Sequence, residues 1–224
     1  MKKYISRNIF FWLVLFLTLI AFLFRFYNFE RDLLFRIDQE RDYQIIKEAF
    51  EKGPGHLPLL GPKAGNPVVL PVDLSGNGDA LNLGPIYYYF QYFSVLAFRK
   101  VSPAALAFPD LFFSVLTIPL FYLILRLVFS RWICLGTTTL WAWSLPLVEY
   151  SRFAWNTNQV LFWQLLLFYA LWKSFFCQEN KKRQIFLLLV FVCLGVLTQL
   201  HFIAFFVFPS LVIVFWFWLG WPKI

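Results

Sequence analysis

Charged residues are scarce in this chain. Only 14% of its 224 residues are Asp, Glu, Lys or Arg, whereas soluble domains usually contain about 25%. Hydrophobic residues make up 60% of the chain and aromatic residues 22%. A domain of this size cannot hide so much apolar surface in its own interior. Lipid must therefore surround much of the chain, which predicts an integral membrane protein.

Cysteine is also rare, and the long polar segment near the N-terminus contains none. The three cysteines lie in apolar runs, so we expect neither a disulfide framework nor a CxxC metal site. No Walker motif, HExxH, GxSxG or GxGxxG occurs, and a nucleotide-driven mechanism therefore has no support. We assign no metal ligands and no certain cofactor, with a divalent metal kept as an open alternative.

The formal net charge is +8. Cytoplasmic loops of membrane proteins collect Lys and Arg, so we attribute this excess to membrane topology, with membrane lipid and not nucleic acid as the partner. Lys2, Lys3 and Arg7 precede an uncharged run over residues 8–24. Because no small-residue cleavage site follows it, this run predicts an uncleaved first span with its N-terminus in the cytoplasm.

A long polar segment comes next. Residues 26–83 are too rich in charge, Gly, Pro and Asn to cross hydrocarbon. Within it, residues 38–51 have apolar positions at helical spacing, which predicts an amphipathic helix on the membrane surface. The apolar run 86–98 is too short to span, and a span there would place the later basic clusters outside. We therefore predict a second surface or re-entrant helix, and a first extracytoplasmic loop of about 26–107.

Longer hydrophobic stretches follow this loop, at 108–129, 132–149, 159–177 and 184–222. The last is long enough for two spans, with a polar break at residues 198–201. The predicted fold class is an all-α integral membrane protein: six transmembrane helices in a single module, residues 1–224, with both termini cytoplasmic.

Two charged residues lie in segments predicted to face the same side of the membrane. Asp38 follows the first span, where a carboxylate can act as general base towards an acceptor hydroxyl; it can equally cap the helix that it precedes. Arg152 lies in the short loop 149–158, where its guanidinium can bind a lipid phosphate or simply reach the interface.

Other polar and aromatic residues are weaker candidates for binding substrate. Asn156 and Asn158 can bind hydroxyls or cap the next helix. Gln199 and His201 form the polar break in an otherwise uncharged stretch, where polar groups are costly and often functional. Aromatic residues can anchor the chain at the headgroup layer or line a sugar site. The remaining candidates of these kinds are Arg41, Asp42, Lys63, Tyr87 and Tyr88.

The order of these motifs resembles that of a known family. A first span is followed by five motifs: Asp38-Gln-Glu-Arg-Asp42, Leu57-Pro-Leu-Leu-Gly-Pro62, Gly84-Pro-Ile-Tyr-Tyr-Tyr89, Tyr150-Ser-Arg-Phe-Ala-Trp-Asn-Thr-Asn158 and Gln199-Leu-His201. This set is similar to the N-terminal part of membrane glycosyltransferases of the GT-C fold. It resembles in particular the family 39-like group of protein mannosyltransferases, aminoarabinose transferases and lipid A core galacturonosyltransferase-like domains.

The resemblance implies a polyprenyl-phosphate sugar donor and inverting transfer to a hydroxyl on a lipid, glycan or protein. It places the essential acidic residue of the first outer loop at Asp38, and we expect Arg152, together with Lys63, to neutralise the departing phosphate. Asn156 or Asn158 stands where the family often has Asp. The resemblance also implies a bacterial plasma membrane location and a chain that is truncated at its C-terminal end. A transporter or channel subunit, and a non-catalytic remnant, are the alternatives.

Overall fold

The computed structural model describes residues 2–35, 37–62 and 82–219, with side chains described from residue 8 onward except that of residue 37. These parts of the chain are almost entirely helical. The helices are α1 (Lys2–Phe26), α2 (Ile37–Lys52), α3 (Ile86–Phe98), α4 (Pro103–Leu125), α5 (Arg131–Ala142), α6 (Leu145–Tyr150), α7 (Val160–Phe176), α8 (Asn180–Leu200) and α9 (Phe202–Leu219), with short 3-10 turns η1 (Pro54–His56) and η2 (Asn156–Gln159).

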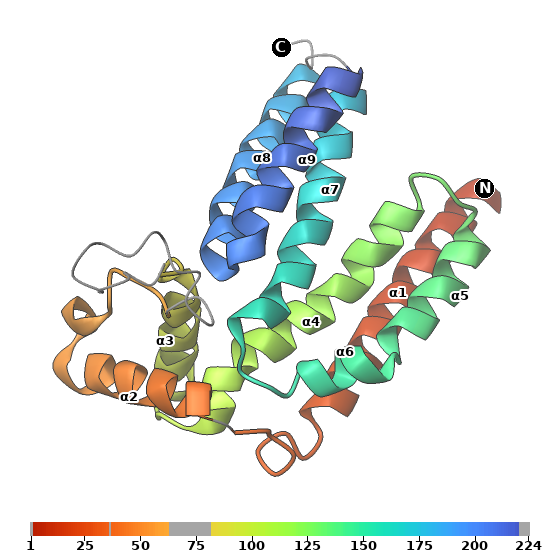
Figure 1. Ribbon diagram of the computed structural model, residues 1–224. Helices are drawn as coiled ribbons and strands as arrows, with labels where there is room; N and C mark the ends of the chain where they lie inside the picture. The colour runs from red at the N-terminus through yellow and green to blue at the C-terminus, as the bar shows by residue number, and fades with distance from the viewer. Residues whose placement is uncertain (1, 36, 63–81, 220–224) are drawn as a thin grey trace.

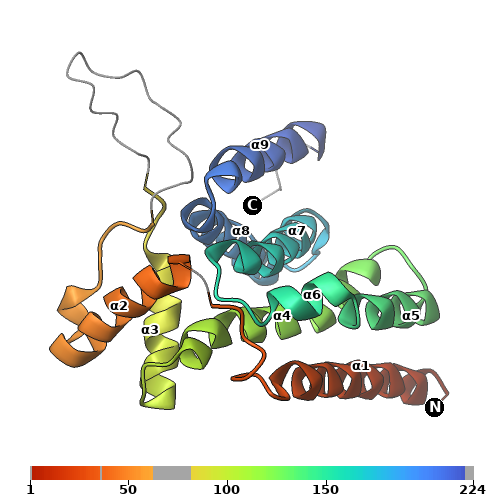
Figure 2. The same ribbon diagram turned by 60° about the horizontal axis from the view of Figure 1, so that its bottom comes forward.

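Helix α4 lies at the centre and contacts α1, α3, α5 and α7. Helices α7, α8 and α9 form a second group that packs on α4 through α7 (Figures 1 and 2). Helices α2 and α3 lie to one side, near the end of the molecule where α6 and the segment after α1 are also found (Figure 1). The start of α1 and the end of α9 lie towards the opposite end.

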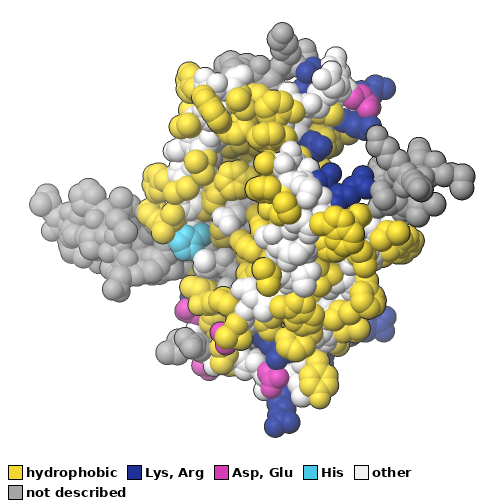
Figure 3. All heavy atoms as spheres, turned by 90° about the vertical axis from the view of Figure 1, so that its right-hand side faces the viewer, with side chains coloured by type: hydrophobic (Ala, Val, Ile, Leu, Met, Phe, Trp, Pro, Cys, Tyr) yellow, Lys and Arg dark blue, Asp and Glu magenta, His cyan; other side chains and the backbone are white. Residues whose placement is uncertain are grey.

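Four helices in the described ranges are long and apolar enough to cross a membrane: Asn8–Phe26 within α1, α4, α8 and α9. Their side chains are widely exposed, with Trp12 of α1 62% and Trp218 of α9 78% accessible. Hydrophobic side chains cover most of the face in Figure 3, and charged side chains gather in its upper and lower parts. This distribution is expected of helices surrounded by lipid.

Two of the six predicted spans are shorter in the structure. The stretch 132–149 is divided into α5 and α6 at Trp143 and Ser144. Pro146 lies in the first turn of α6, where its missing N–H is tolerated. The stretch 159–177 becomes α7, which has 17 residues, or about 26 Å at the rise of an α-helix. The prediction of six spans therefore stays a prediction beyond these four helices.

Local sequence signals agree closely with the helix bounds elsewhere. Helix α2 covers the predicted amphipathic segment, α3 has the same ends as the apolar run 86–98, and the break between α8 and α9 falls at His201. Helix α4 begins earlier than the predicted span at 108. Ser102 caps it by accepting a hydrogen bond from the backbone N–H of Ala105 at 3.2 Å, a cap that extends a helix ahead of its apolar core.

Candidate active site

The two polar segments that the sequence places on one side of the membrane lie against each other. The Gln39 side chain at the start of α2 donates from Nε2 to the backbone oxygen of Ala154 at 2.7 Å. Leu34 pairs with Phe153 in an isolated parallel bridge, and its N–H donates to the Arg152 carbonyl at 3.4 Å. These contacts bring the beginning of α2 to the segment that follows α6.

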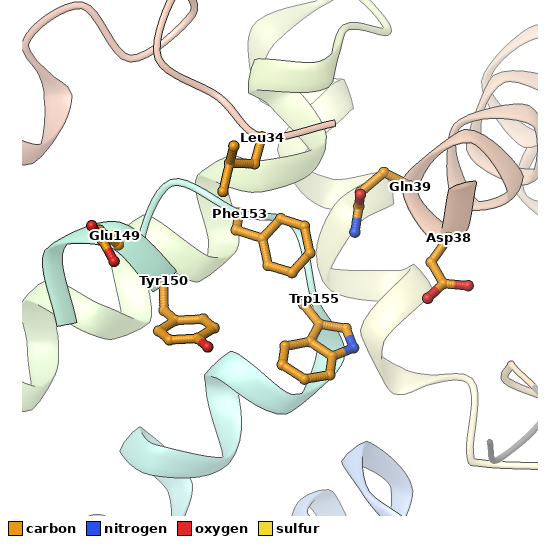
Figure 4. Close-up of a pocket in the computed structure, with 7 residues that line it drawn as sticks. All are labelled: Leu34, Asp38, Gln39, Glu149, Tyr150, Phe153 and Trp155. Carbon is orange, nitrogen blue, oxygen red and sulfur yellow. The ribbon is translucent and has the colours of Figure 1, made fainter. Parts of the chain in front are cut away.

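A cavity of about 410 Å³ lies at this junction. Asp38 and Gln39 approach it from α2, and Glu149 and Tyr150 approach it from α6, with Phe153 and Trp155 between them (Figure 4). Its lining residues are Leu34, Asp38, Gln39, Glu149, Tyr150, Phe153 and Trp155. Two carboxylates and several aromatic rings thus face one hollow.

Asp38 is accessible and has a cation beside it. It is the second residue of α2 and therefore lies in the first turn of the helix, not at the predicted N-cap. A negative charge in the first turn interacts favourably with the helix dipole. Its side chain is 65% exposed, and its Oδ1 lies 3.5 Å from Nη1 of Arg41. Arg41 is itself held by Asp42, whose Oδ1 accepts from Nε at 3.0 Å and from Nη2 at 2.8 Å.

Asp42 is buried below this pair. Burial raises the pKa of Asp42 above its ordinary value, and the hydrogen bonds and charge of Arg41 offset only part of that effect. The hydroxyl of Tyr88 is also hydrogen-bonded to Asp42. Burial, followed by the charge of Asp42, raises the pKa of Tyr88 to about 12. Asp42 and Tyr88 therefore support Arg41 from beneath and do not line the cavity.

Arg152 is turned away from the cavity. Its guanidinium donates to the backbone oxygens of Phe24, Arg25 and Tyr27 at 2.8, 3.2 and 3.0 Å. Its Nη1 also forms an ion pair with Asp32 at 2.9 Å. These acceptors include the last carbonyls of α1, which have no partner within the helix. Arg152 therefore ties the segment after α6 to the end of the first helix.

The side chains of the two predicted asparagines, Asn156 and Asn158, donate hydrogen bonds to backbone carbonyls of the chain. Nδ2 of Asn158 donates to the backbone oxygens of Tyr150 and Phe153 at 2.9 and 2.6 Å, which holds their turn together. Nδ2 of Asn156 donates to the carbonyl of Leu200 at the end of α8. Neither residue caps a helix, because η2 has Trp155 at its N-cap and no side-chain cap.

Gln199 and His201 lie at the break between α8 and α9, apart from the Asp38 cavity. The carbonyl of Gln199 accepts from the Gly84 N–H at 3.2 Å. A Cβ on Gly84 would lie 2.2 Å from Cγ of Gln199, so glycine is required for this approach. Nδ1 of His201 accepts from the backbone N–H of Ile203 at 3.1 Å. The contact between Gly84 and Gln199 thus joins the segment before α3 to the α8–α9 break.

Tyr87 is buried between α3 and α4, where its hydroxyl donates to Oδ2 of Asp110 at 2.9 Å. Lys63 lies outside the described residues. Of the predicted site residues, the structure thus brings Asp38, Arg41, Asp42 and Tyr88 together. It places Arg152, Asn156 and Gln199 in contacts between distant segments, and Asn158 and His201 in contacts within their own turns.

Sequence reasoning missed several residues that line the cavity. Gln39 and Trp155 lie inside the motifs given above and Glu149 lies directly before one of them, but none of the three was predicted as a site residue. Glu149 is the acidic residue of the second polar segment, four positions before the 153–155 stretch that forms the cavity wall. Within the described ranges, no group of three or more His, Cys, Asp or Glu residues could hold a metal ion.

These features define a multi-pass membrane protein with an acid-lined cavity at one end of its helices. The sequence profile of the dolichyl-phosphate-mannose-protein mannosyltransferase family matches residues 76–224, more than half of the chain. The chain belongs to this family of GT-C glycosyltransferases, as its ordered motifs implied. The match begins after Asp38, so the first part of the cavity lies outside it. No curated protein and no solved structure matches the chain.

Proposed function

We propose that the chain transfers a sugar from a polyprenyl-phosphate donor to a hydroxyl of a lipid, glycan or protein acceptor. The observation that carries this proposal is the cavity in which the accessible carboxylate of Asp38 faces the segment after α6, in a chain of a mannosyltransferase family. The family description names mannose as the donor sugar and a protein as the acceptor. We propose mannose here, on the extracytoplasmic face of a bacterial plasma membrane.

In the proposed reaction Asp38 is the general base. Its carboxylate takes the proton of the acceptor hydroxyl as that oxygen bonds to the anomeric carbon of the sugar. The bond from this carbon to the donor phosphate oxygen breaks, and polyprenyl phosphate leaves with the electron pair. Attack from the side opposite the phosphate inverts the anomeric carbon. The 65% exposure of Asp38 allows an acceptor from outside the membrane to reach it.

The departing phosphate requires a neighbouring cation, because its developing charge must be stabilised in a site with little water. We propose Lys63 for this role, as the resemblance implies. Arg41, which Asp42 holds 3.5 Å from Asp38, lies on the side of the base, and we propose that it orients the Asp38 carboxylate. Since the hydrogen bonds of Arg152 are made within the chain, we propose that it positions the wall of the cavity.

The test compares transfer of radiolabelled mannose from polyprenyl-phosphate mannose in membranes containing wild-type protein or Asp38→Asn. The amide of Asn cannot accept the proton, so transfer should fall at least 100-fold, the lower range for general base catalysis, about 10²–10⁴. Glu51→Gln is the matched control: Glu51 is an exposed carboxylate on the same helix that does not line the cavity. Full activity in Asp38→Asn would overturn the assignment.

A further inference from the structure

A second, smaller cavity adjoins the first. Its volume is about 250 Å³, and it is bounded by α4, α6 and the segment through η2. Tyr150 and Trp155 line both cavities, and their rings are stacked with centroids 6.4 Å apart and planes at 26°. This aromatic pair is therefore the wall that the two cavities share. A ligand at Asp38 lies next to the second cavity.

A buried carboxyl group without a complete set of partners lines this second cavity. Asp110 of α4 is 1% exposed. Its Oδ2 accepts a hydrogen bond from Tyr87, whereas its Oδ1 is buried with no hydrogen-bond partner. The backbone N–H of Trp155 and the side chain of Gln159 also interact with the carboxyl group, but Oδ1 has no partner at hydrogen-bonding geometry. Such a group costs free energy in a native protein and calls for an explanation.

The character of the cavity points to a neutral, hydroxyl-bearing ligand. Its lining, all within the described residues, contains no basic side chain but includes Ser114, Ser151 and Thr157 beside Asp110. A phosphate would find no cation there. The hydroxyls of Ser114 and Ser151 already donate to backbone carbonyls, whereas Oδ1 of Asp110 is a carboxyl oxygen with no hydrogen-bond partner and so is a strong acceptor for a ligand hydroxyl. The volume is below the range of about 300–1,000 Å³ that suits drug-sized ligands, and a single sugar ring is smaller than these.

We propose that Oδ1 of Asp110 accepts a hydrogen bond from a hydroxyl of the donor sugar, which makes this second cavity the sugar subsite. The inference rests on the proposed function, and it divides the donor between two places. The phosphate lies outside this subsite, whose lining contains no cation, and the anomeric carbon faces the first cavity, from which Asp38 and the acceptor approach it. The sugar lies in the second cavity, where its ring packs against Trp155. One of its hydroxyls donates the hydrogen bond that Oδ1 of Asp110 lacks.

The test separates the sugar from the rest of the donor. Equilibrium binding to the purified full chain is measured with two probes, polyprenyl-phosphate mannose and sugar-free polyprenyl phosphate. The Asp110→Asn variant keeps the size of the side chain and one oxygen to accept from Tyr87. It should bind the mannose donor roughly 10- to 100-fold more weakly, as expected for a lost hydrogen bond to a charged group. Its affinity for sugar-free polyprenyl phosphate should be unchanged.

Thr138→Val is the matched control. The hydroxyl of Thr138 on α5 is also buried without a partner, but Thr138 lines neither cavity. Its removal should change the affinity for neither probe. An independent readout uses a set of donors, each lacking one hydroxyl of the sugar. Wild-type protein should bind one of these deoxy donors more weakly than the complete donor. Asp110→Asn should bind that deoxy donor and the complete donor with equal affinity.

The outcomes are distinct. If Asp110→Asn binds both probes as the wild type does, or loses affinity for both equally, the sugar subsite is wrong while the proposed function stands. If wild-type protein binds neither probe, the proposed function fails and the subsite fails with it. Loss confined to the mannose-bearing probe supports both.

Discussion

Replacing Arg152 by lysine tests whether this residue acts through the fold or through a phosphate. The arginine bridges two segments more than 120 positions apart in sequence. Three of its contacts are with backbone carbonyls at the end of α1, and the fourth is with Asp32. Lysine keeps the positive charge but presents it at one point, without the planar fork that reaches several acceptors at once.

The size of the effect follows from these contacts. A hydrogen bond to a charged group contributes about 1.5–3 kcal/mol. Arg152 is 16% exposed, so water can replace part of the loss and the lower value applies to each of the three carbonyl contacts. If lysine keeps one of them, Arg152→Lys should lower the free energy of unfolding by about 3 kcal/mol. The ion pair with Asp32, 43% exposed, should add no more than about 1 kcal/mol.

The assay is a reversible unfolding titration in mixed micelles, with sugar transfer measured under conditions where both proteins are folded. Asp32→Asn is the control, since it removes the ion pair and leaves the carbonyl contacts. An Arg152→Lys variant as stable as the wild type would refute the positioning role. If that variant also lost transfer activity, Arg152 would act on the phosphate, as the sequence suggests.

Two further predictions concern the fold around the cavity. Gly61→Ala should destabilise the protein by about 1–3 kcal/mol, because the new Cβ would lie 2.1 Å from the backbone oxygen of Gly84. Gly136→Ala should instead stabilise α5 by about 0.5–1 kcal/mol, because nothing lies within 4 Å of its new Cβ. Equal unfolding midpoints for the two variants would contradict this contrast. The raised pKa of Asp42 means that the folded state binds more protons than the unfolded state between the unfolded pKa of 3.8 and the folded one. Lowering the pH from 7 towards 4 should therefore raise the free energy of unfolding of the wild type relative to that of Asp42→Asn. If the difference between the two free energies does not change with pH, burial does not raise the pKa of Asp42.

Features that depend on neighbouring residues were readable from the sequence. The apolar spacing of residues 38–51 gave the bounds of α2 within one residue, and the run 86–98 gave those of α3. Both follow from periodicity and composition, which act locally. The family was likewise visible in the order of short motifs, and the profile match confirms it. The start of α4 was wrong by five residues because its first turn is capped by Ser102 and contains alanines of low hydrophobicity.

Features that depend on distant contacts were not readable. Arg152 was predicted as a phosphate ligand because its position in a polar loop suggested exposure, yet its acceptors are at the end of a helix more than 120 positions earlier in sequence. Glu149 lies directly before one of the motifs, and nothing nearby indicated that it would line the same cavity as Asp38. Asp110 was not predicted as a site residue, because its hydrogen bond with Tyr87 depends on how α3 packs against α4.

The sequence by itself therefore determined a helical membrane protein, the positions of most of its helices, its family and the carboxylate proposed as base. Hydrophobicity and helical period are properties of adjacent residues, and they need no knowledge of how helices pack. Only the tertiary structure decided which polar groups come to one place: Asp38 and Glu149 line the same cavity, and Asp110 is hydrogen-bonded to Tyr87 beside another. Those pairings depend on how α2, α3, α4 and α6 pack together, and packing is settled by long-range contacts that no local pattern specifies.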